Sequence, residues 1–232
     1  MKPETADNLL ELVKQNYNDI AADFDVTRKK ALWPEIGEWT KAIKAGDKIL
    51  DVGCGNGRLL EALQDKKVDY LGVDNSSELI KLAQRNYPRA KFLVGDILDL
   101  EKATTAQFDY IFCLAVLPHL PSQELRARAL REMKDRLKVG GQLVISAWNL
   151  WAQPKYRLLI LKNVWLKLSG RHKLAINDLL FPWKTAGGET KSLRYYHTFT
   201  GRELKGLVGK SGLQLEKFFK DQHNYWLVLK NN

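Results

Sequence analysis

Cysteine, methionine and long apolar runs are all scarce in this 232-residue chain. The two cysteines, Cys54 and Cys113, are too few for a disulfide framework or a thiolate zinc cluster, and we expect no metal site. No stretch approaches the ~20 uncharged apolar residues that span a bilayer, and no apolar signal segment opens the chain. Free buried thiols are typical of a reducing compartment, so we expect a cytoplasmic protein without a membrane span.

Acidic residues are scarce only in the last third of the chain. Residues 1–150 contain 22 Lys and Arg against 22 Asp and Glu, whereas residues 151–232 contain 15 against 5. The whole net charge of +10 therefore lies in the last third. Such a basic region suits an anionic partner, with nucleic acid as the first candidate and a membrane surface as the second. A solvated basic face without a partner is the remaining alternative.

Short apolar runs alternate with amphipathic stretches in the first two thirds of the chain. The runs span residues 48–52, 70–74, 91–94, 108–114 and 142–146. This alternation predicts an α/β fold with a mostly parallel sheet and helices on both faces. Ligands of such sheets bind at the carboxyl ends of the strands. The distinctive residues fall at those ends: Asp51, Asp74, Asp96, residues 114–119 and Trp148.

We predict a single domain over residues 1–232, because a chain of this length with 45% hydrophobic residues can bury one large core. Residues 1–44 are interpreted as N-terminal helices over the site, and residues 45–150 as the cofactor-binding core. Residues 151–200 are interpreted as a basic insert and acceptor region, with an amphipathic lid segment. Residues 201–232 are expected to form a final helix and two antiparallel strands.

The glycine loop at residues 53–57 has the spacing G-x-G-x-G, and Arg58 stands where a dinucleotide fingerprint has its third glycine. Asp51, two residues before the loop, would repel a pyrophosphate but attract a cationic cofactor. S-adenosylmethionine has no phosphate and carries an ammonium and a sulfonium group. Asp74 is placed for its ribose hydroxyls and Asp96 for its adenine edge. Helix capping is the alternative role of each aspartate alone.

Three stretches, residues 50–57, 72–76 and 137–141, together resemble the class I S-adenosylmethionine-dependent methyltransferases. The resemblance implies a Rossmann-like fold whose seven-stranded sheet has one antiparallel strand, and it implies S-adenosylmethionine as the cofactor. It also implies a set of cofactor-binding residues. They are Tyr17, Asp51, Gly53, Cys54, Gly55, Asn56, Asp74, Asn75, Asp96, Ile97, Leu114 and Ala115.

Several flanking segments resemble one branch of these enzymes, the tRNA wobble-uridine carboxymethyl methyltransferases. The segments are residues 17–28, 33–34, 114–120, 146–148, 181–183 and 194–199. Those enzymes esterify the carboxylate of 5-carboxymethyluridine in the anticodon, so the resemblance implies an RNA-binding enzyme of tRNA modification. Eukaryotic and archaeal relatives work with a small zinc-binding activator subunit, which this sequence neither requires nor excludes. The chain departs from the family in having a single histidine, His119, where relatives often have two, and in its basic insert at 154–178.

The candidate acceptor residues follow from the chemistry of a carboxylate. A carboxylate is already a nucleophile at pH 7, so it needs orientation rather than a general base. The planar fork of an arginine matches it, and Arg28 and Arg194 are the candidates. His119 is a candidate hydrogen-bond donor to the acceptor or its base. The alternative roles are an ordinary ion pair for Arg28 and a backbone hydrogen bond for His119.

Aromatic residues and a second histidine complete the candidate acceptor site. The candidates for stacking on a splayed uridine, the usual way in which single-stranded RNA bases are bound, are Trp148, Tyr195 and Tyr196. His197 belongs to a run of large polar-tipped residues at 194–197, which suits the mouth of a site. Core packing is the alternative role of these side chains.

Two other functions stay open from the sequence. A methyltransferase for a small carboxylic acid or another metabolite would keep the cofactor site and make the basic region incidental. A non-catalytic RNA- or partner-binding module would keep only the fold, although the intact loop at 51–57 and Asp74 argue against it.

Overall fold

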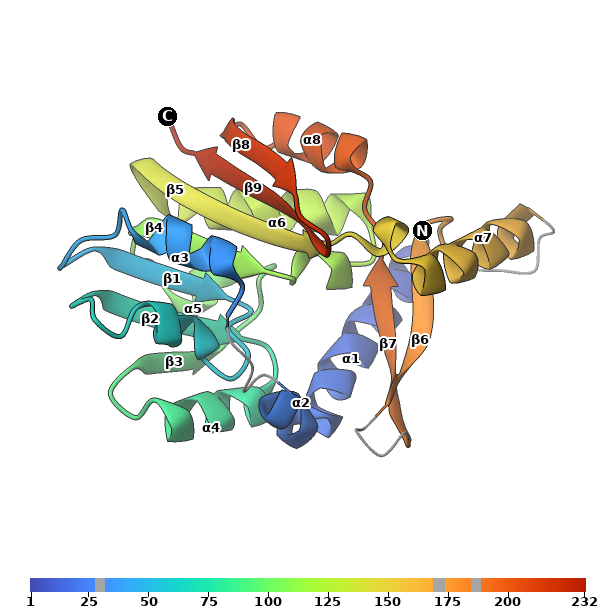
Figure 1. The fold of residues 1–232 in the computed structure, drawn as a ribbon, viewed down its shortest axis with the longest axis horizontal. Helices are drawn as coiled ribbons and strands as arrows, with labels where there is room; N and C mark the ends of the chain where they lie inside the picture. The colour runs from blue at the N-terminus through green and yellow to red at the C-terminus, as the bar shows by residue number, and fades with distance from the viewer. Residues whose placement is uncertain (28–31, 169–173, 185–188) are drawn as a thin grey trace.

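A seven-stranded sheet forms the centre of the fold. The computed structural model describes residues 1–27, 32–168, 174–184 and 189–232. The strands are β1 (Lys48–Val52), β2 (Asp69–Asp74), β3 (Lys91–Val94), β4 (Phe108–Leu114), β5 (Leu137–Trp148), β8 (Gln214–Lys220) and β9 (Asn224–Lys230), in the order β3-β2-β1-β4-β5-β9-β8. The first five pair in parallel, and β9 runs antiparallel to both of its neighbours. The predicted α/β sheet with one antiparallel strand is thus confirmed (Figure 1).

Helices cover both faces of this sheet. One face carries α5 (Leu100–Ala103), α6 (Gln123–Asp135) and α8 (Gly201–Gly209), and the other carries α3 (Pro34–Thr40), the 3₁₀ helix η1 (Arg58–Ala62) and α4 (Ser77–Asn86). Leu130 and Met133 of α6 join the core on the first face, and Ile80 and Ala83 of α4 join it on the second. Apolar positions three residues apart give each helix one buried stripe.

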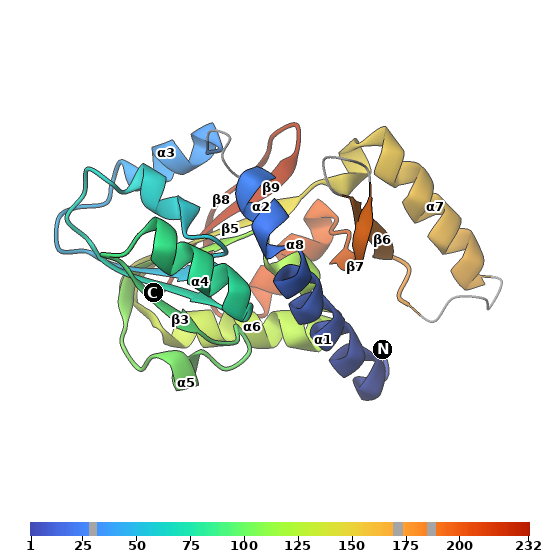
Figure 2. The same cartoon turned by 90° about the horizontal axis from the view of Figure 1, so that it is seen from below.

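A further group of elements lies beyond the carboxyl ends of the parallel strands (Figure 1). It contains α1 (Pro3–Asp19), α2 (Ala21–Thr27), α7 (Pro154–Leu168) and a hairpin of β6 (Asp178–Lys184) and β7 (Thr190–His197). Leu9 and Val13 of α1 pack with Tyr195 of β7, and Ile160 of α7 packs with Tyr196. The hairpin is therefore held between α1 and α7 (Figure 2).

The flanking segments differ in detail from the sequence expectation. Among the N-terminal helices expected within residues 1–44, α1 ends at Asp19 and α2 begins at Ala21, so that Ile20 separates the two. The basic segment predicted as a lid folds as α7 followed by the β6–β7 hairpin, because the side chains of β7 alternate between two packed clusters as a strand requires. Within the described residues, no helix is long and apolar enough to cross a bilayer. Cys54 and Cys113 are free and buried.

Candidate functional site

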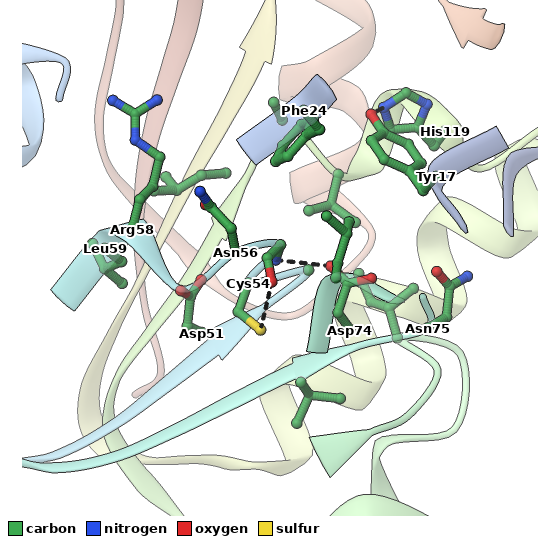
Figure 3. Close-up of a pocket in the computed structure, with 18 of the residues that line it drawn as sticks. Tyr17, Phe24, Asp51, Cys54, Asn56, Arg58, Leu59, Asp74, Asn75 and His119 are labelled. Carbon is green, nitrogen blue, oxygen red and sulfur yellow. Dashed lines mark hydrogen bonds between the residues drawn. The ribbon is translucent and has the colours of Figure 1, made fainter. Parts of the chain in front are cut away.

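One cavity lies at the carboxyl ends of β1, β2 and β4 (Figure 3). All twelve residues predicted to bind the cofactor line it, namely Tyr17, Asp51, Gly53, Cys54, Gly55, Asn56, Asp74, Asn75, Asp96, Ile97, Leu114 and Ala115. Phe24, Trp33 and Val116 line it as well, although they were not among the predicted cofactor-binding residues. Phe24 lies seven residues after Tyr17 in one helical pattern, and this shared face is the signal that could have found it.

The glycine loop approaches its neighbours too closely for side chains. Gly53 has a φ of 71° and Gly55 a φ of 56°, a left-handed conformation that glycine adopts without strain. A Cβ on Gly53 would lie 2.3 Å from Cγ2 of Val116. The Gly55 N–H donates a 2.9 Å hydrogen bond to Oδ2 of Asp74, which ties the loop to the end of β2. The loop thus offers backbone rather than side chains to a ligand.

Asp51 places a buried carboxyl group on the cavity wall. Burial raises its pKa from 3.8 to about 7; the hydroxyl of Tyr70, which donates to Oδ2 at 2.8 Å, opposes this rise, and nearby Asp74 adds to it. None of these influences supplies a positive charge, so ionised Asp51 would gain strongly from a cationic ligand. The ammonium group of S-adenosylmethionine is such a ligand, and the donor set of the cavity therefore fits this cofactor.

Asp74 is held rigidly beside the glycine loop. Its Oδ2 accepts from Gly55 N and its Oδ1 accepts from Ser76 N, both at 2.9 Å, while burial raises its pKa. Asn75 lines the cavity next to it, and Asp96 and Ile97 line the wall after β3. Asp96 is exposed and Ile97 is buried, so the wall at this point has one polar and one apolar part. The ribose and adenine roles of these residues remain predictions.

The short helix α2 covers the glycine loop. Oδ1 of Asp25 accepts hydrogen bonds from the amides of Asn56 at 2.9 Å and of Asn86 at 3.0 Å. The ring of Phe24 lies 3.2 Å from the position that a Cβ on Gly55 would take. Oδ1 of Asn56 is buried and has no hydrogen-bond partner among the described residues, so it is available to a polar ligand. These two hydrogen bonds attach α2 to the glycine loop and to α4.

The turn after β4 carries backbone strain at the cavity. Ala115 has a φ of 61°, and among the described residues it is the only non-glycine with a positive φ. Its N–H donates to the carbonyl oxygen of Ser146 at 3.0 Å, which fixes the turn against β5. Strain of this kind persists where the surroundings over-determine the conformation, and it clusters at functional sites.

His119 links three elements through its ring. It lies at the end of the 3₁₀ helix η2 (Leu117–His119), with Nδ1 3.0 Å from the carbonyl oxygen of Tyr195 and Nε2 2.9 Å from the hydroxyl of Tyr17. A carbonyl can only accept, so Nδ1 carries the hydrogen and Nε2 accepts from the Tyr17 hydroxyl. Burial, with a smaller effect of Arg194, lowers the pKa of His119 to about 3. Both ring nitrogens are therefore engaged within the protein, and the ring stays neutral near pH 7.

Arg194 of β7 is a buried cation. The residue is only 4% exposed, and its guanidinium carbon lies 4.0 Å from the ring centre of Trp183 and 5.7 Å from that of Tyr17. Its Nε and Nη2 atoms are buried without a hydrogen-bond partner among the described residues. A buried charge is costly unless it is paired, so this geometry favours an anionic ligand. Tyr17 lines the cofactor cavity, which places Arg194 one side chain away from it.

Two predicted acceptor residues lie on the other face of β7. Tyr195 is fully buried among Leu9, Val13 and Leu174, a core position rather than a stacking surface. His197 is buried between two carboxylates, with Nδ1 2.7 Å from Asp178 and Nε2 2.7 Å from Glu203. These contacts tie the hairpin to α8 and point away from the cavity. The correction follows from strand geometry, because a run of four residues sends alternate side chains to opposite faces.

Two further candidates complete the account of the acceptor prediction. Trp148 is half-buried at the end of β5, and its ring stacks on Tyr196 with 5.6 Å between the ring centres. Its backbone N–H also donates to the Tyr196 hydroxyl at 3.2 Å. Arg28 lies outside the described residues. Among the described residues, no group of three or more His, Cys, Asp and Glu could hold a metal ion.

Comparisons with known proteins find a methyltransferase domain in this chain. Residues 49–141 match the family model of the methyltransferase domain. The chain is 31% identical to the tRNA (carboxymethyluridine(34)-5-O)-methyltransferase of Saccharomyces cerevisiae, over 81% of this chain and 62% of that protein. It is 26% identical to the protein of the same name from Schizosaccharomyces pombe, over 96% of this chain and 97% of that protein. It is 27% identical to tRNA (carboxymethyluridine(34)-5-O)-methyltransferase alkbh8 of Xenopus tropicalis, over 95% of this chain but only 41% of that protein's length.

Solved structures share the fold. An S-adenosylmethionine-dependent methyltransferase from Methanosarcina mazei superposes with a TM-score of 0.67 at 22% identity, over 87% of this chain and 99% of that one. The CcbJ methyltransferase from Streptomyces caelestis gives a TM-score of 0.69 at 17% identity, over 93% of this chain and 97% of that one. The matched model identifies residues 49–141 as a methyltransferase domain, and the sheet order and the solved structures show that the chain has the fold of S-adenosylmethionine-dependent methyltransferases.

Proposed function

We propose that this methyltransferase acts on the carboxylate of a 5-carboxymethyl-type uridine at the wobble position of tRNA and forms its methyl ester. The sequence relatives are named for carboxymethyluridine at position 34 of tRNA, and two of the three are longer than this chain. The basic last third of the chain suits a polyanionic partner. We also propose that residues 1–44 cover the site and that residues 151–200 bind the acceptor, within one domain.

The observation that carries the proposal is the buried guanidinium of Arg194, whose Nε and Nη2 have no hydrogen-bond partner in the part of the chain that the structure describes. Its planar fork can donate two parallel hydrogen bonds to one carboxylate. Trp183 lies against the guanidinium and Tyr17 is next to it, so the fork is held without being neutralised. An amide or a hydroxyl acceptor would leave the positive charge uncompensated, and a carboxylate would not.

Orientation is the main task left to the protein. S-adenosylmethionine, when bound, supplies an electrophilic methyl group on a positive sulfur. A carboxylate acceptor would displace that methyl group from sulfur without giving up a proton, so the chain would need no general base and Arg194 would only have to orient the carboxylate. His119 is neutral and doubly hydrogen-bonded, which agrees with a positioning role rather than proton transfer. Asp51 would hold the ammonium end, and the glycine loop would hold the aminoacyl part.

The test is transfer of a labelled methyl group from S-adenosylmethionine to tRNA, with and without mild alkaline treatment of the tRNA. Alkali hydrolyses existing methyl esters and restores acceptor carboxylates. We expect label to enter the treated tRNA, and to leave it as methanol when the product is exposed to base. A labelled product that survives base would show transfer to a different atom and would contradict the ester.

Absence of label from both tRNA samples would also contradict the simple proposal, provided that calorimetry shows cofactor binding. One repeat with a candidate activator subunit would then decide whether a partner is required. If that repeat also fails, small carboxylic acids become the acceptors to assay, because Arg194 would bind their carboxylates equally well.

A further inference from the structure

The helix α7 has an apolar stripe on each of two opposite faces. Ile160 lies on the inner face and packs with Leu179 and Tyr196 of the hairpin. The outer face carries Leu158, Leu161 and Trp165, which are 70%, 53% and 61% exposed. Their spacing of three, four and seven residues puts them in one row along the helix. Large apolar side chains in a contiguous exposed row are unusual on a soluble protein and mark an interaction surface.

Cations border this outer stripe on both sides. With 3.6 residues per turn, Arg157 falls on one side of the row and Lys155 and Lys162 fall on the other. All three are exposed, and α7 contains no aspartate or glutamate. The surface therefore combines a flat indole ring and two leucines with a positive rim. Its complement is a partner that offers both anionic groups and flat apolar groups.

The position of α7 selects among anionic partners. It packs on β6 and lies beyond the hairpin from α1, past the carboxyl ends of the parallel strands (Figures 1 and 2). The residues that line the cavity lie at those strand ends as well. The neighbouring strand β7 carries Arg194. A polyanion that presents one group to Arg194 can therefore extend across the hairpin and reach the outer face of α7. An RNA chain has this form, since its phosphates are anionic and its unpaired bases have apolar faces.

We propose that the outer face of α7 is a docking surface for the RNA of the substrate. Trp165 stacks on an unpaired base, Leu158 and Leu161 contact the sugar and base next to it, and Arg157 and Lys162 contact phosphates. The inference rests on the proposed function, because it assumes an RNA acceptor. It assigns binding of the RNA body to α7 and binding of the reacting carboxylate to β7.

The test is a titration of fluorescently labelled tRNA with the full chain, followed by anisotropy at several salt concentrations. We expect Trp165→Ala to weaken binding about tenfold, the usual effect of losing one stacked base. We expect the double variant Arg157→Glu, Lys162→Glu to lower the slope of log affinity against log salt by about 0.7 for each lost phosphate contact. The substituted side chains are exposed, so melting temperature and cofactor affinity should stay at the wild-type values.

A matched control is the double variant Lys44→Glu, Lys210→Glu. It has the same net charge change, and both side chains are exposed on loops away from α7. Equal losses in the two double variants would overturn the inference, because they would show a charge effect without a docking site. Unchanged affinity in Trp165→Ala would overturn it as well.

A second arm replaces tRNA with vesicles of phosphatidylcholine and phosphatidylserine. Tighter binding to vesicles than to tRNA, lost in Trp165→Ala, would overturn the inference in favour of a membrane surface. Methyl transfer by the wild-type chain is measured separately. A chain that binds tRNA through α7 without methylating it would contradict the proposed function and leave the docking surface supported.

Discussion

The cofactor cavity and the acceptor hairpin are opposite in charge. The cavity buries a carboxyl group, Asp51, whose neighbours supply no positive charge. The hairpin buries a guanidinium, Arg194, whose Nε and Nη2 have no partner among the described residues. Each site is costly to keep by itself and each suits a ligand of opposite charge. A cationic methyl donor would therefore bind in the cavity and an anionic acceptor would bind at the hairpin. Tyr17 lies between the two regions and contacts both.

The largest expected effect comes from a substitution that disables the acceptor hairpin and leaves the cofactor cavity intact. We expect Arg194→Gln to lower kcat/KM for tRNA on the order of 10³-fold, because truncating a buried charge pair costs about 2–5 kcal/mol. The dissociation constant of S-adenosylmethionine, measured by calorimetry, should hardly change. The melting temperature of the ligand-free chain should rise, since an unpaired buried charge is removed.

A neighbour on the same strand provides the control for Arg194. Lys191 is partly exposed and pairs with Asp23 at 2.6 Å, so Lys191→Gln should change kcat/KM by no more than about fivefold. Equal losses in the two variants would show that Arg194 acts only through the general positive charge of the hairpin.

A second substitution breaks the cofactor side alone. We expect Asp51→Asn to weaken S-adenosylmethionine binding about 30-fold, since it removes the charge partner of the ammonium group. Folding raises the pKa of Asp51, so the protonated carboxyl group favours the folded state. This contribution to the free energy of unfolding is fully present below pH 4 and is lost as pH rises through about 7. The ligand-free variant should therefore melt at a higher temperature than the wild type at pH 8, with a smaller difference at pH 5. A variant that melts lower at pH 8 would contradict this account.

The pH dependence separates the two regions without a substitution. Asp51 has a pKa of about 7 and must be ionised to attract the ammonium group, so affinity for S-adenosylmethionine should fall about tenfold from pH 8 to pH 6. Binding at pH 7 should release a proton, detectable as a calorimetric heat that varies with the buffer. His119, with a pKa of about 3, should add no inflection in this range. The same pH dependence in Asp51→Asn would show that another group titrates.

The smallest expected effect falls on the residue that the two regions share. Tyr17→Phe removes the hydrogen bond to His119 and keeps the ring next to Arg194. One such bond contributes about 1 kcal/mol, so we expect about a fivefold loss. Because Tyr17 touches both regions, the loss should divide between the cofactor dissociation constant and the KM for tRNA. A loss confined to one of the two would show that Tyr17 belongs to that region only.

The two regions also differ in how far the sequence predicts them. The cofactor side depends on short spacings, such as the glycine loop and the aspartates at strand ends. The alternation of apolar runs and amphipathic stretches predicts the mostly parallel sheet, and the family resemblance implies its seven strands with one antiparallel strand. All twelve predicted cofactor residues line one cavity. That they bind the cofactor stays a prediction.

The acceptor side depends on contacts between elements far apart in the chain. Arg194 and His197 are separated by three positions and therefore face opposite ways, a fact that requires knowing that residues 190–197 form a strand. The role of Trp183 required the pairing of β6 with β7. The hairpin itself was missed because its residues follow a basic helix and share no short motif with the core.

Insertions and deletions are a common route of divergence between related chains, and β7 tolerates few of them. One extra residue between Arg194 and His197 would turn one of the two side chains to the opposite face of the hairpin. Two extra residues would restore the faces but move Arg194 about 7 Å along the strand relative to His197. In this chain the number of residues between Arg194 and His197 therefore sets both the face that each side chain occupies and the distance between them, and a change in chain length is tolerated more easily elsewhere.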